Sequence, residues 1–258
     1  RGDCQPGLRA LAGVAGRALE TLCSSDIGFA IAPRLNAAGR LEDMAVGIEC
    51  LLADDPRQAE QLAGALDAIN AERREVQQQM VDQAEALLDA WPMPEGRLPP
   101  ILCLHDPGWH PGVVGLVASR LKERLHRPVL AFAPAEPGSE RLRGSARSIS
   151  GFHVRDALAE VDAAHPGLIE RFGGHAMAAG LSLVASHLPE FSAALEAVAA
   201  RRLDPGLLAR EIISDGPLGG GDFSRSLAEQ LRLAGPWGQA FPGPVFDNTF
   251  ELLDWRVV

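Results

Sequence analysis

The spacing of apolar residues predicts one long helix, followed by a region in which strands and helices alternate. From 57 to 90, apolar side chains recur at intervals of three, four and seven, with one glycine and no proline. Asp55 precedes this stretch as an N-cap and Pro56 takes the first helical position. We therefore expect a single helix of about 35 residues, or ~50 Å, that joins two lobes. The alternative is a helix that lies wholly within one domain.

Shorter elements are predicted on either side of this helix. Before it, we expect helices at 7–12, 15–23 and about 44–52, and a loop that carries residues 34–40. After it, the proline-rich segment 91–100 marks a boundary. Beyond the boundary, we expect strands at 101–104, 129–133, 141–148, 180–184, 211–214 and 246–258, and helices at 112–125, 153–164, 189–201 and 223–233. This alternation predicts an α/β layer with a ligand at the strand ends. The chain stops inside the last element, which suggests a fragment.

Composition narrows the function classes. The formal net charge of −10 over 258 residues argues against a broad basic surface for duplex DNA. No apolar run approaches the ~18 residues of a membrane span, and nothing at the start indicates export. The four cysteines show no CxxC spacing, which favours free thiols in a reducing cytoplasm. We therefore expect a cytoplasmic globular protein without a membrane partner.

Arginine is concentrated where acid is missing. Four arginines and no carboxylate lie between Arg141 and Arg155, and the segment 28–40 also lacks acids. On an acidic chain, such local positive charge suits a narrow groove for one strand.

Three short segments have the composition of phosphate-binding sites. Gly173 and Gly174 leave room for close backbone approach and His175 can donate, so this segment is expected to form an anion nest or helix start. The other two segments combine arginine forks with small polar side chains. They contribute Arg34, Asn36 and Arg40, and Ser145, Arg147 and Ser148. His110 is a further candidate, and no motif for a metal centre, nucleophile elbow or P-loop is present.

Five segments, taken in order, resemble the RecJ family of single-stranded-DNA-specific exonucleases, within the DHH phosphoesterase superfamily. They are 28–41 (GFAIAPRLNAAGRL), 109–115 (WHPGVVG), 144–148 (GSARS), 172–180 (FGGHAMAAG) and 234–238 (AGPWG). The resemblance implies a metal-dependent 5′→3′ exonuclease of recombination and repair in bacteria. It maps the tail of a DHH domain to 1–54, a connecting helix to 55–91, a DHH-associated substrate-binding domain to 92–205 and the start of an OB-like domain to 206–258.

The same resemblance implies roles for the candidate residues. Arg34 and Arg40 would hold backbone phosphate near the scissile bond, and Asn36 would orient them. Ser145 and Arg147, with Ser148 beside them, would anchor the terminal 5′ phosphate. Gly173, Gly174 and His175 would contact phosphate near the active cleft, with His110 in the same cleft. For Arg34 the alternative is a structural pair with a carboxylate of a domain outside this sequence.

Cofactor and partners are likewise implied by the resemblance. Manganese or magnesium would be bound by a DHH domain whose motifs are missing here, so no metal is expected in this chain and the fragment alone is expected to be inert. Single-stranded DNA is the expected ligand, and single-strand-binding protein and a RecQ-type helicase are expected partners. Two alternatives remain, a non-catalytic module like that of alanyl-tRNA synthetases and a DHH-family phosphodiesterase for oligonucleotides or cyclic dinucleotides.

Overall fold

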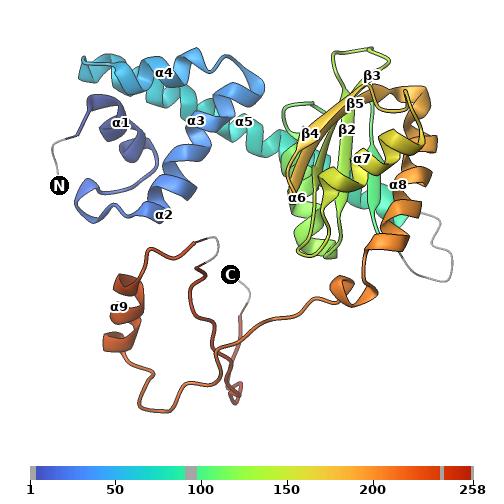
Figure 1. Ribbon diagram of the computed structural model, residues 1–258. Helices are drawn as coiled ribbons and strands as arrows, with labels where there is room; N and C mark the ends of the chain where they lie inside the picture. The colour runs from blue at the N-terminus through green and yellow to red at the C-terminus, as the bar shows by residue number, and fades with distance from the viewer. Residues whose placement is uncertain (1–3, 91–97, 239–240, 257–258) are drawn as a thin grey trace. The chain divides into compact units, whose positions relative to one another are not determined.

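The computed structural model describes residues 4–90, 98–238 and 241–256. These residues fall into two compact units, Arg1–Ala209 and Arg210–Val258, which we describe separately (Figure 1). The first unit begins with helices and continues with a sheet flanked by helices. Its first part contains α1 (Pro6–Val14), a 3₁₀ turn η1 (Leu19–Thr21), α2 (Ser24–Asp26), a π-helical turn η2 (Ile27–Ile31), α3 (Ala32–Leu41), α4 (Ala45–Leu52) and α5 (Pro56–Asp89).

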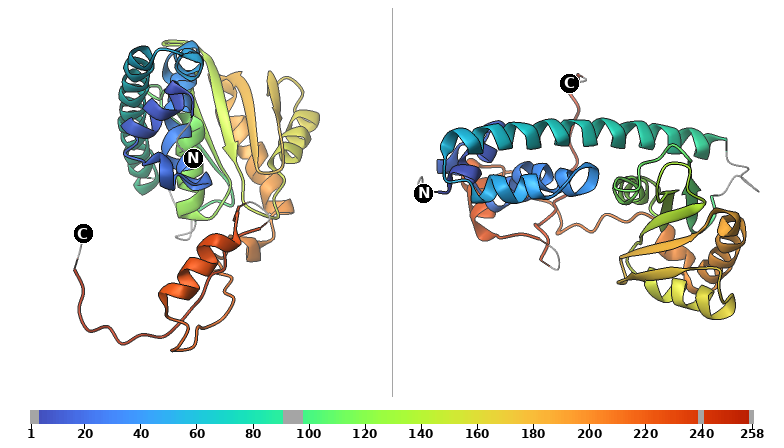
Figure 2. Two further views of the ribbon diagram at one scale, coloured as in Figure 1. Left: turned by 90° about the vertical axis from the view of Figure 1, so that its left-hand side faces the viewer. Right: turned by 90° about the horizontal axis from the view of Figure 1, so that it is seen from above.

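Helix α5 is the long helix that the apolar spacing predicts, and its 34 residues run without interruption. Asp55 caps it by accepting from the backbone N–H of Arg57 at 3.2 Å. The N-terminal half contributes Leu66 to a core shared with α1, α3 and α4. The C-terminal half contributes Met80 and Ala84 to a second core against the sheet. One rigid element therefore belongs to both cores (Figure 2).

The sheet contains five strands in the order β1-β2-β3-β5-β4. Only β1 and β2 are parallel, and the other neighbours pair antiparallel. The strands are β1 (Leu102–His105), β2 (Val129–Pro134), β3 (Arg141–Arg147), β4 (Arg171–Gly174) and β5 (Ala178–Val184). The helices are α6 (Val114–Leu125), α7 (Val154–Ala164) and α8 (Leu188–Arg202), with the 3₁₀ turns η4 (Ala185–His187) before α8 and η5 (Pro205–Leu208) after it. The mixed α/β class is confirmed.

The two faces of the sheet are covered to different extents. Helices α7 and α8 cover one face, where Phe132 of β2 packs edge-to-face on Phe191 of α8 at 5.8 Å. On the other face, α6 and the end of α5 pack on β1 and β2, and α6 reaches as far as β3. On this second face, residues Arg143, Arg171, Gly173 and Gly180 of β3, β4 and β5 are exposed. A polar floor is thereby left open beside α6.

Several expectations about local structure are wrong. Residues 34–40 belong to helix α3 instead of a loop, because Pro33 lies in the first turn, where its missing N–H costs nothing, and Ala37 and Ala38 are buried. The expected helix at 15–23 is reduced to η1. The glycine segment forms edge strand β4 and a hairpin turn, not a nest or helix start. Most of the boundary segment 91–100 lies outside the described residues.

The second unit shows little regular structure in its described residues. It contains α9 (Arg225–Ala234), which Ser224 caps by accepting from the Leu227 N–H at 3.2 Å, and an isolated bridge between Gly238 and Phe241. The strands expected at 211–214 and in the described part of 246–258 are not formed. Among the described residues of the whole chain, no helix is long and apolar enough to span a membrane, and all four cysteines are unpaired.

The close packing beneath the sheet predicts different outcomes at two glycines of neighbouring strands. A Cβ at Gly144 would lie 2.4 Å from the buried Phe132 ring, whereas a Cβ at Gly180 would have only a carbonyl oxygen at 3.9 Å. We expect Gly144→Ala to lower the free energy of unfolding by about 1–3 kcal/mol through overpacking. Gly180→Ala, the matched control, should leave it unchanged or slightly higher. Urea unfolding of both variants measures this, and equal destabilisation would contradict the assigned faces.

Candidate anion-binding site

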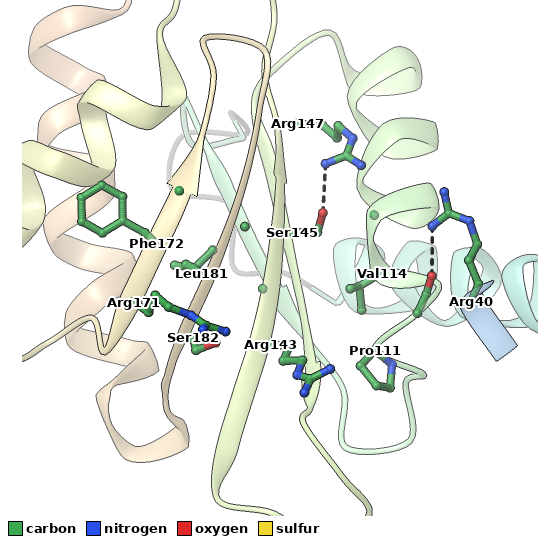
Figure 3. A pocket seen from close by; sticks show the side chains of 15 residues that line it. Arg40, Pro111, Val114, Arg143, Ser145, Arg147, Arg171, Phe172, Leu181 and Ser182 are labelled. Atoms are coloured by element: carbon green, nitrogen blue, oxygen red, sulfur yellow. Dashed lines mark hydrogen bonds between the residues drawn. The ribbon is translucent and has the colours of Figure 1, made fainter. Parts of the chain in front are cut away.

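A pocket of about 590 Å³ lies over the open part of the sheet, between β3, β5, β4 and the start of α6 (Figure 3). Its polar lining comes from four arginines and two serines, with glycines between them. These residues are Arg40, Arg143, Arg147, Arg171, Ser145, Ser182, Gly112, Gly115, Gly144, Gly173 and Gly180. No carboxylate lines it. The pocket is therefore strongly positive although the chain as a whole is acidic.

The pleat of β3 places the arginines on the pocket side. Along this strand, Leu142, Gly144 and Ala146 are buried, whereas Arg143, Ser145 and Arg147 alternate with them and line the pocket. Cross-strand register then aligns small residues opposite them, because directly opposed residues share a face. Ser145 lies opposite Gly180, which lies opposite Gly173, and these three residues form the floor.

Arg147 and Arg40 form the more enclosed end of the pocket. The Arg147 Nη1 donates to the Ser145 Oγ at 2.9 Å and to the Ala146 carbonyl at 2.8 Å. The Arg40 Nη1 donates to the Gly112 carbonyl at 3.2 Å. Neither guanidinium has a carboxylate within ion-pair distance among the described residues. Both therefore keep donors for an anion.

Electrostatics supports the same interpretation. Burial lowers the pKa of Arg147, and the nearby positive charge of Arg40 lowers this pKa further. Guanidinium stays protonated in proteins, so two partly buried positive charges repel each other here. An anion placed between them would offset that repulsion and accept bidentate hydrogen bonds.

Two glycines allow close contacts around the start of α6, one with the end of α3 and one with β3. A Cβ at Gly115 would lie 2.9 Å from both the Arg147 Nη2 and the Ser145 Oγ. A Cβ at Gly112 would lie 2.1 Å from the Arg40 carbonyl oxygen. A side chain at position 112 would force the loop before α6 away from the end of α3, and one at position 115 would displace the side-chain ends of Arg147 and Ser145. The start of α6 adds the partial positive charge of a helix N-terminus beside the arginines.

The structure brings together four of the residues predicted from sequence, Arg40, Ser145, Arg147 and Gly173. His110 lies in the loop before α6, where its Nδ1 accepts from the Gly112 N–H at 3.1 Å, but it does not line the pocket. Its contribution is to the shape of that loop.

The remaining predicted residues lie elsewhere or serve the fold. The Ser148 hydroxyl is buried and donates to the Phe152 carbonyl at 2.6 Å. Gly174 has a φ of 145°, which the hairpin requires, and His175 is exposed in the turn, where its N–H donates to the Ala178 carbonyl at 2.7 Å. Asn36 is exposed on α3 and has no hydrogen bond to either arginine among the described contacts.

Arg34 is engaged in helix packing. Its Nε lies 2.8 Å from the Asp67 carboxylate of α5, and its Nη1 donates to the Ala30 carbonyl at 2.6 Å. Its Nη2 donates to the Val14 carbonyl at 3.3 Å. These contacts favour the structural alternative for Arg34, with a carboxylate of this same chain as its partner.

Sequence reasoning missed Arg143, Arg171 and Ser182, which line the other end of the pocket. The alternation of Arg141, Arg143, Ser145 and Arg147 with small or apolar residues is the signal that points to the first of these. Arg171 had no such signal, because its strand was not predicted.

The described residues do not fit a metal centre. No group of three or more His, Cys, Asp or Glu side chains among them is arranged to hold a metal ion. The pair His105 and Asp106 stands alone at the end of β1.

Comparison with known proteins gives the family. The DHHA1 domain matches residues 99–201. Over 257 residues, the chain is 50% identical to the single-stranded-DNA-specific exonuclease RecJ of Escherichia coli (strain K12), and the match covers 100% of this chain and 44% of that protein. The chain belongs to the RecJ family.

Solved RecJ structures share the fold. Crystal structures of RecJ from Thermus thermophilus in complex with Mg²⁺ and with Mn²⁺ each match with a TM-score of 0.79 and 34% identity over 95% of this chain. The matches cover 36% and 34% of those chains, respectively. This RecJ-family chain thus spans less than half the length of the relatives that it matches.

The contacts of Arg34 predict a stability effect without a binding effect. Arg34→Ala removes three hydrogen-bonding contacts and leaves the Ala30 and Val14 carbonyls without this donor. We expect unfolding to become easier by about 1–3 kcal/mol. Affinity for a single-stranded oligonucleotide, measured under conditions where the variant is folded, should stay within twofold. Unchanged stability with lost affinity would instead restore Arg34 as a phosphate ligand.

Proposed function

We propose that this chain is the strand-binding part of a single-stranded-DNA-specific exonuclease, and that its arginine pocket holds a phosphate at the 5′ end of the strand. The observation that carries the proposal is a pocket with four arginines and no acid, in a chain that is 50% identical to a RecJ exonuclease over its whole length. In this proposal Arg40 and Arg147 grip the phosphate, and Ser145 turns its hydroxyl toward the phosphate oxygens.

Charge distribution suits a single strand. Phosphate contacts fix register and carry no sequence information, as a general exonuclease needs. Outside the pocket the acidic body repels a polyanion, so binding depends on the few arginines that reach the strand. The two alternatives, a tRNA-synthetase-like module and a small phosphodiesterase, are less favoured. The relatives that match over nearly all of this chain are exonucleases by name.

Hydrolysis would require groups from outside the described residues. The Thermus relatives bind Mg²⁺ and Mn²⁺, and we infer that a divalent metal serves the complete enzyme. The side chains described here do not form a site for it, so their contribution is to bind and orient the strand. The same proposal includes 5′→3′ polarity and a role in recombination and repair in the bacterial cytoplasm. It also includes contacts with single-strand-binding protein and a RecQ-type helicase.

The domain assignments also stay predictions. The two cores that share α5 are compatible with three of these assignments. They are the tail of a DHH domain at 1–54, a connector at 55–91 and the associated domain at 92–205. The OB-like assignment of 206–258 has less support, since the described residues beyond Arg210 form α9 and one isolated bridge.

Arg147→Ala tests the proposal directly. We expect it to weaken binding of a 5′-phosphorylated oligothymidylate by about 1–3 kcal/mol, because a charge-assisted contact is lost. It should also lower the slope of log K against log salt by about 0.7. Fluorescence anisotropy at several salt concentrations measures both quantities. Arg201→Ala, which removes the same charge from α8 on the opposite side of the sheet, is the control and should change neither. Equal affinities of Arg147→Ala and the unmodified chain would refute the proposal.

Gly180→Ala tests the pocket floor. No protein atom other than a carbonyl oxygen at 3.9 Å is near the added methyl group, so the fold should accept it. The methyl group would nevertheless enter the space above Ser145 and Gly173 that we assign to the strand. We expect affinity for the same oligothymidylate to fall about tenfold at unchanged stability, by anisotropy and urea unfolding. Full affinity would show that the ligand does not approach the floor.

A further inference from the structure

The pocket has a second cationic end that the terminal phosphate leaves unused. Arg143, Ser182 and Arg171 form one cross-strand row over β3, β5 and β4, because Arg143 is in register with Ser182 and Ser182 with Arg171. Directly opposed residues share a face, so a hydroxyl lies between two guanidinium-bearing side chains. The outer residues are two strand spacings apart, ~10 Å, which leaves room for one anion above Ser182.

Neither arginine of this row forms an ion pair with a carboxylate among the described residues. Glu170 is the acid next to Arg171 in sequence, and its carboxylate pairs with Arg141 at 2.9 Å. Glu136 and Glu170 both line an adjoining cavity to which the row also belongs, but neither forms an ion pair with Arg143 or Arg171. Both guanidinium groups therefore keep donors for an anion, although two carboxylates lie in the adjoining cavity. An anion above Ser182 would therefore be attracted by two guanidinium groups at once.

The row is separate from the Arg40–Arg147 end. Arg143 lies two residues from Ser145 and four from Arg147 along β3, or ~7 Å and ~14 Å at the usual rise. Figure 3 shows Arg143 and Arg171 toward one end of β3 and Arg147 toward the other, with Ser145 between. One phosphate held between Arg40 and Arg147 cannot also occupy the space above Ser182.

We propose that the row Arg143–Ser182–Arg171 is a second phosphate subsite, so that the pocket binds two phosphate groups of one ligand at the same time. The proposal rests on the proposed function in taking a phosphorylated strand end as the ligand. The second group is either the next phosphodiester of the strand or a further phosphate on its 5′ end. Both present the same chemistry, a tetrahedral anion that accepts from two guanidinium forks and one hydroxyl.

Three small ligands separate these sources. Thymidine 5′-monophosphate offers one phosphate group, 5′-phosphorylated dithymidylate offers two on successive nucleotides, and thymidine 5′-diphosphate offers two in direct linkage. Their affinities are measured by calorimetry at low salt with the unmodified chain and with Arg143→Ala, Arg171→Ala and the double variant. Arg201→Ala is the charge-matched control.

We expect at least one two-phosphate ligand to bind about tenfold more tightly than the monophosphate. The row variants should remove that advantage while leaving the monophosphate within twofold, and Arg143→Lys, which keeps the charge, should retain part of it. If the dithymidylate binds more tightly, the group in the second subsite is an internal phosphodiester. If the diphosphate binds more tightly, it is an additional phosphate on the 5′ end.

Other outcomes overturn the proposal in distinguishable ways. If neither two-phosphate ligand exceeds the monophosphate, or if the row variants weaken all three ligands equally, there is one phosphate site and no second subsite. If longer oligothymidylates bind in a manner that depends on Arg147 and not on the row, only this inference fails. If no phosphorylated ligand binds at all, the proposed function fails with it.

Discussion

The two-residue alternation of strand β3 decides most of what this chain can do. Leu142 and Ala146 point into the core beneath the sheet, and Arg143, Ser145 and Arg147 point away from it. A shift of one residue in the pairing would bury the guanidiniums and expose the apolar side chains. The hydrophobic core therefore holds the arginine and serine side chains of the pocket in place, because the same register serves both faces. The pairing register of β3 therefore determines both the packing of the core and the lining of the pocket.

A second constraint is the incomplete cover of one sheet face. Helices α7 and α8 cover the face that carries Phe132 and Leu181, whereas on the other face α5 and α6 pack with residues of β1 and β2, and α6 also packs on β3. The bare part would be a weakness in a purely structural domain. In this chain, glycines and serines form the surface of that bare part of the sheet, and arginines lie around it. Glycines at 112 and 115 then allow close contacts around the start of α6, with the end of α3 and with β3, at one wall of the pocket.

The sequence allowed the elements to be predicted better than their assembly. The long helix, most strands and the arginine-rich segment could be predicted, because apolar spacing and capping are local. The strand β4 could not, since Phe172, Gly173 and Gly174 have no alternating pattern and pair only because β5 lies beside them. The same limit affected Arg34 and Ser148. The composition of the segments around these two residues suggested phosphate contact. In the fold, however, Arg34 pairs with Asp67, which is distant in sequence, and the Ser148 hydroxyl donates to the backbone carbonyl of Phe152, which no sequence pattern indicates.

Arg40 reaches the pocket from a helix that is anchored in the other core. Its helix α3 packs on the N-terminal half of α5, while Arg147 belongs to a sheet that packs on the C-terminal half of the same helix. A ligand bound by both residues would connect the two cores a second time, in addition to their connection through α5. Bending of α5 would then have to weaken one of these two contacts, so a ligand bound in this way would stiffen the first unit along its longest helix.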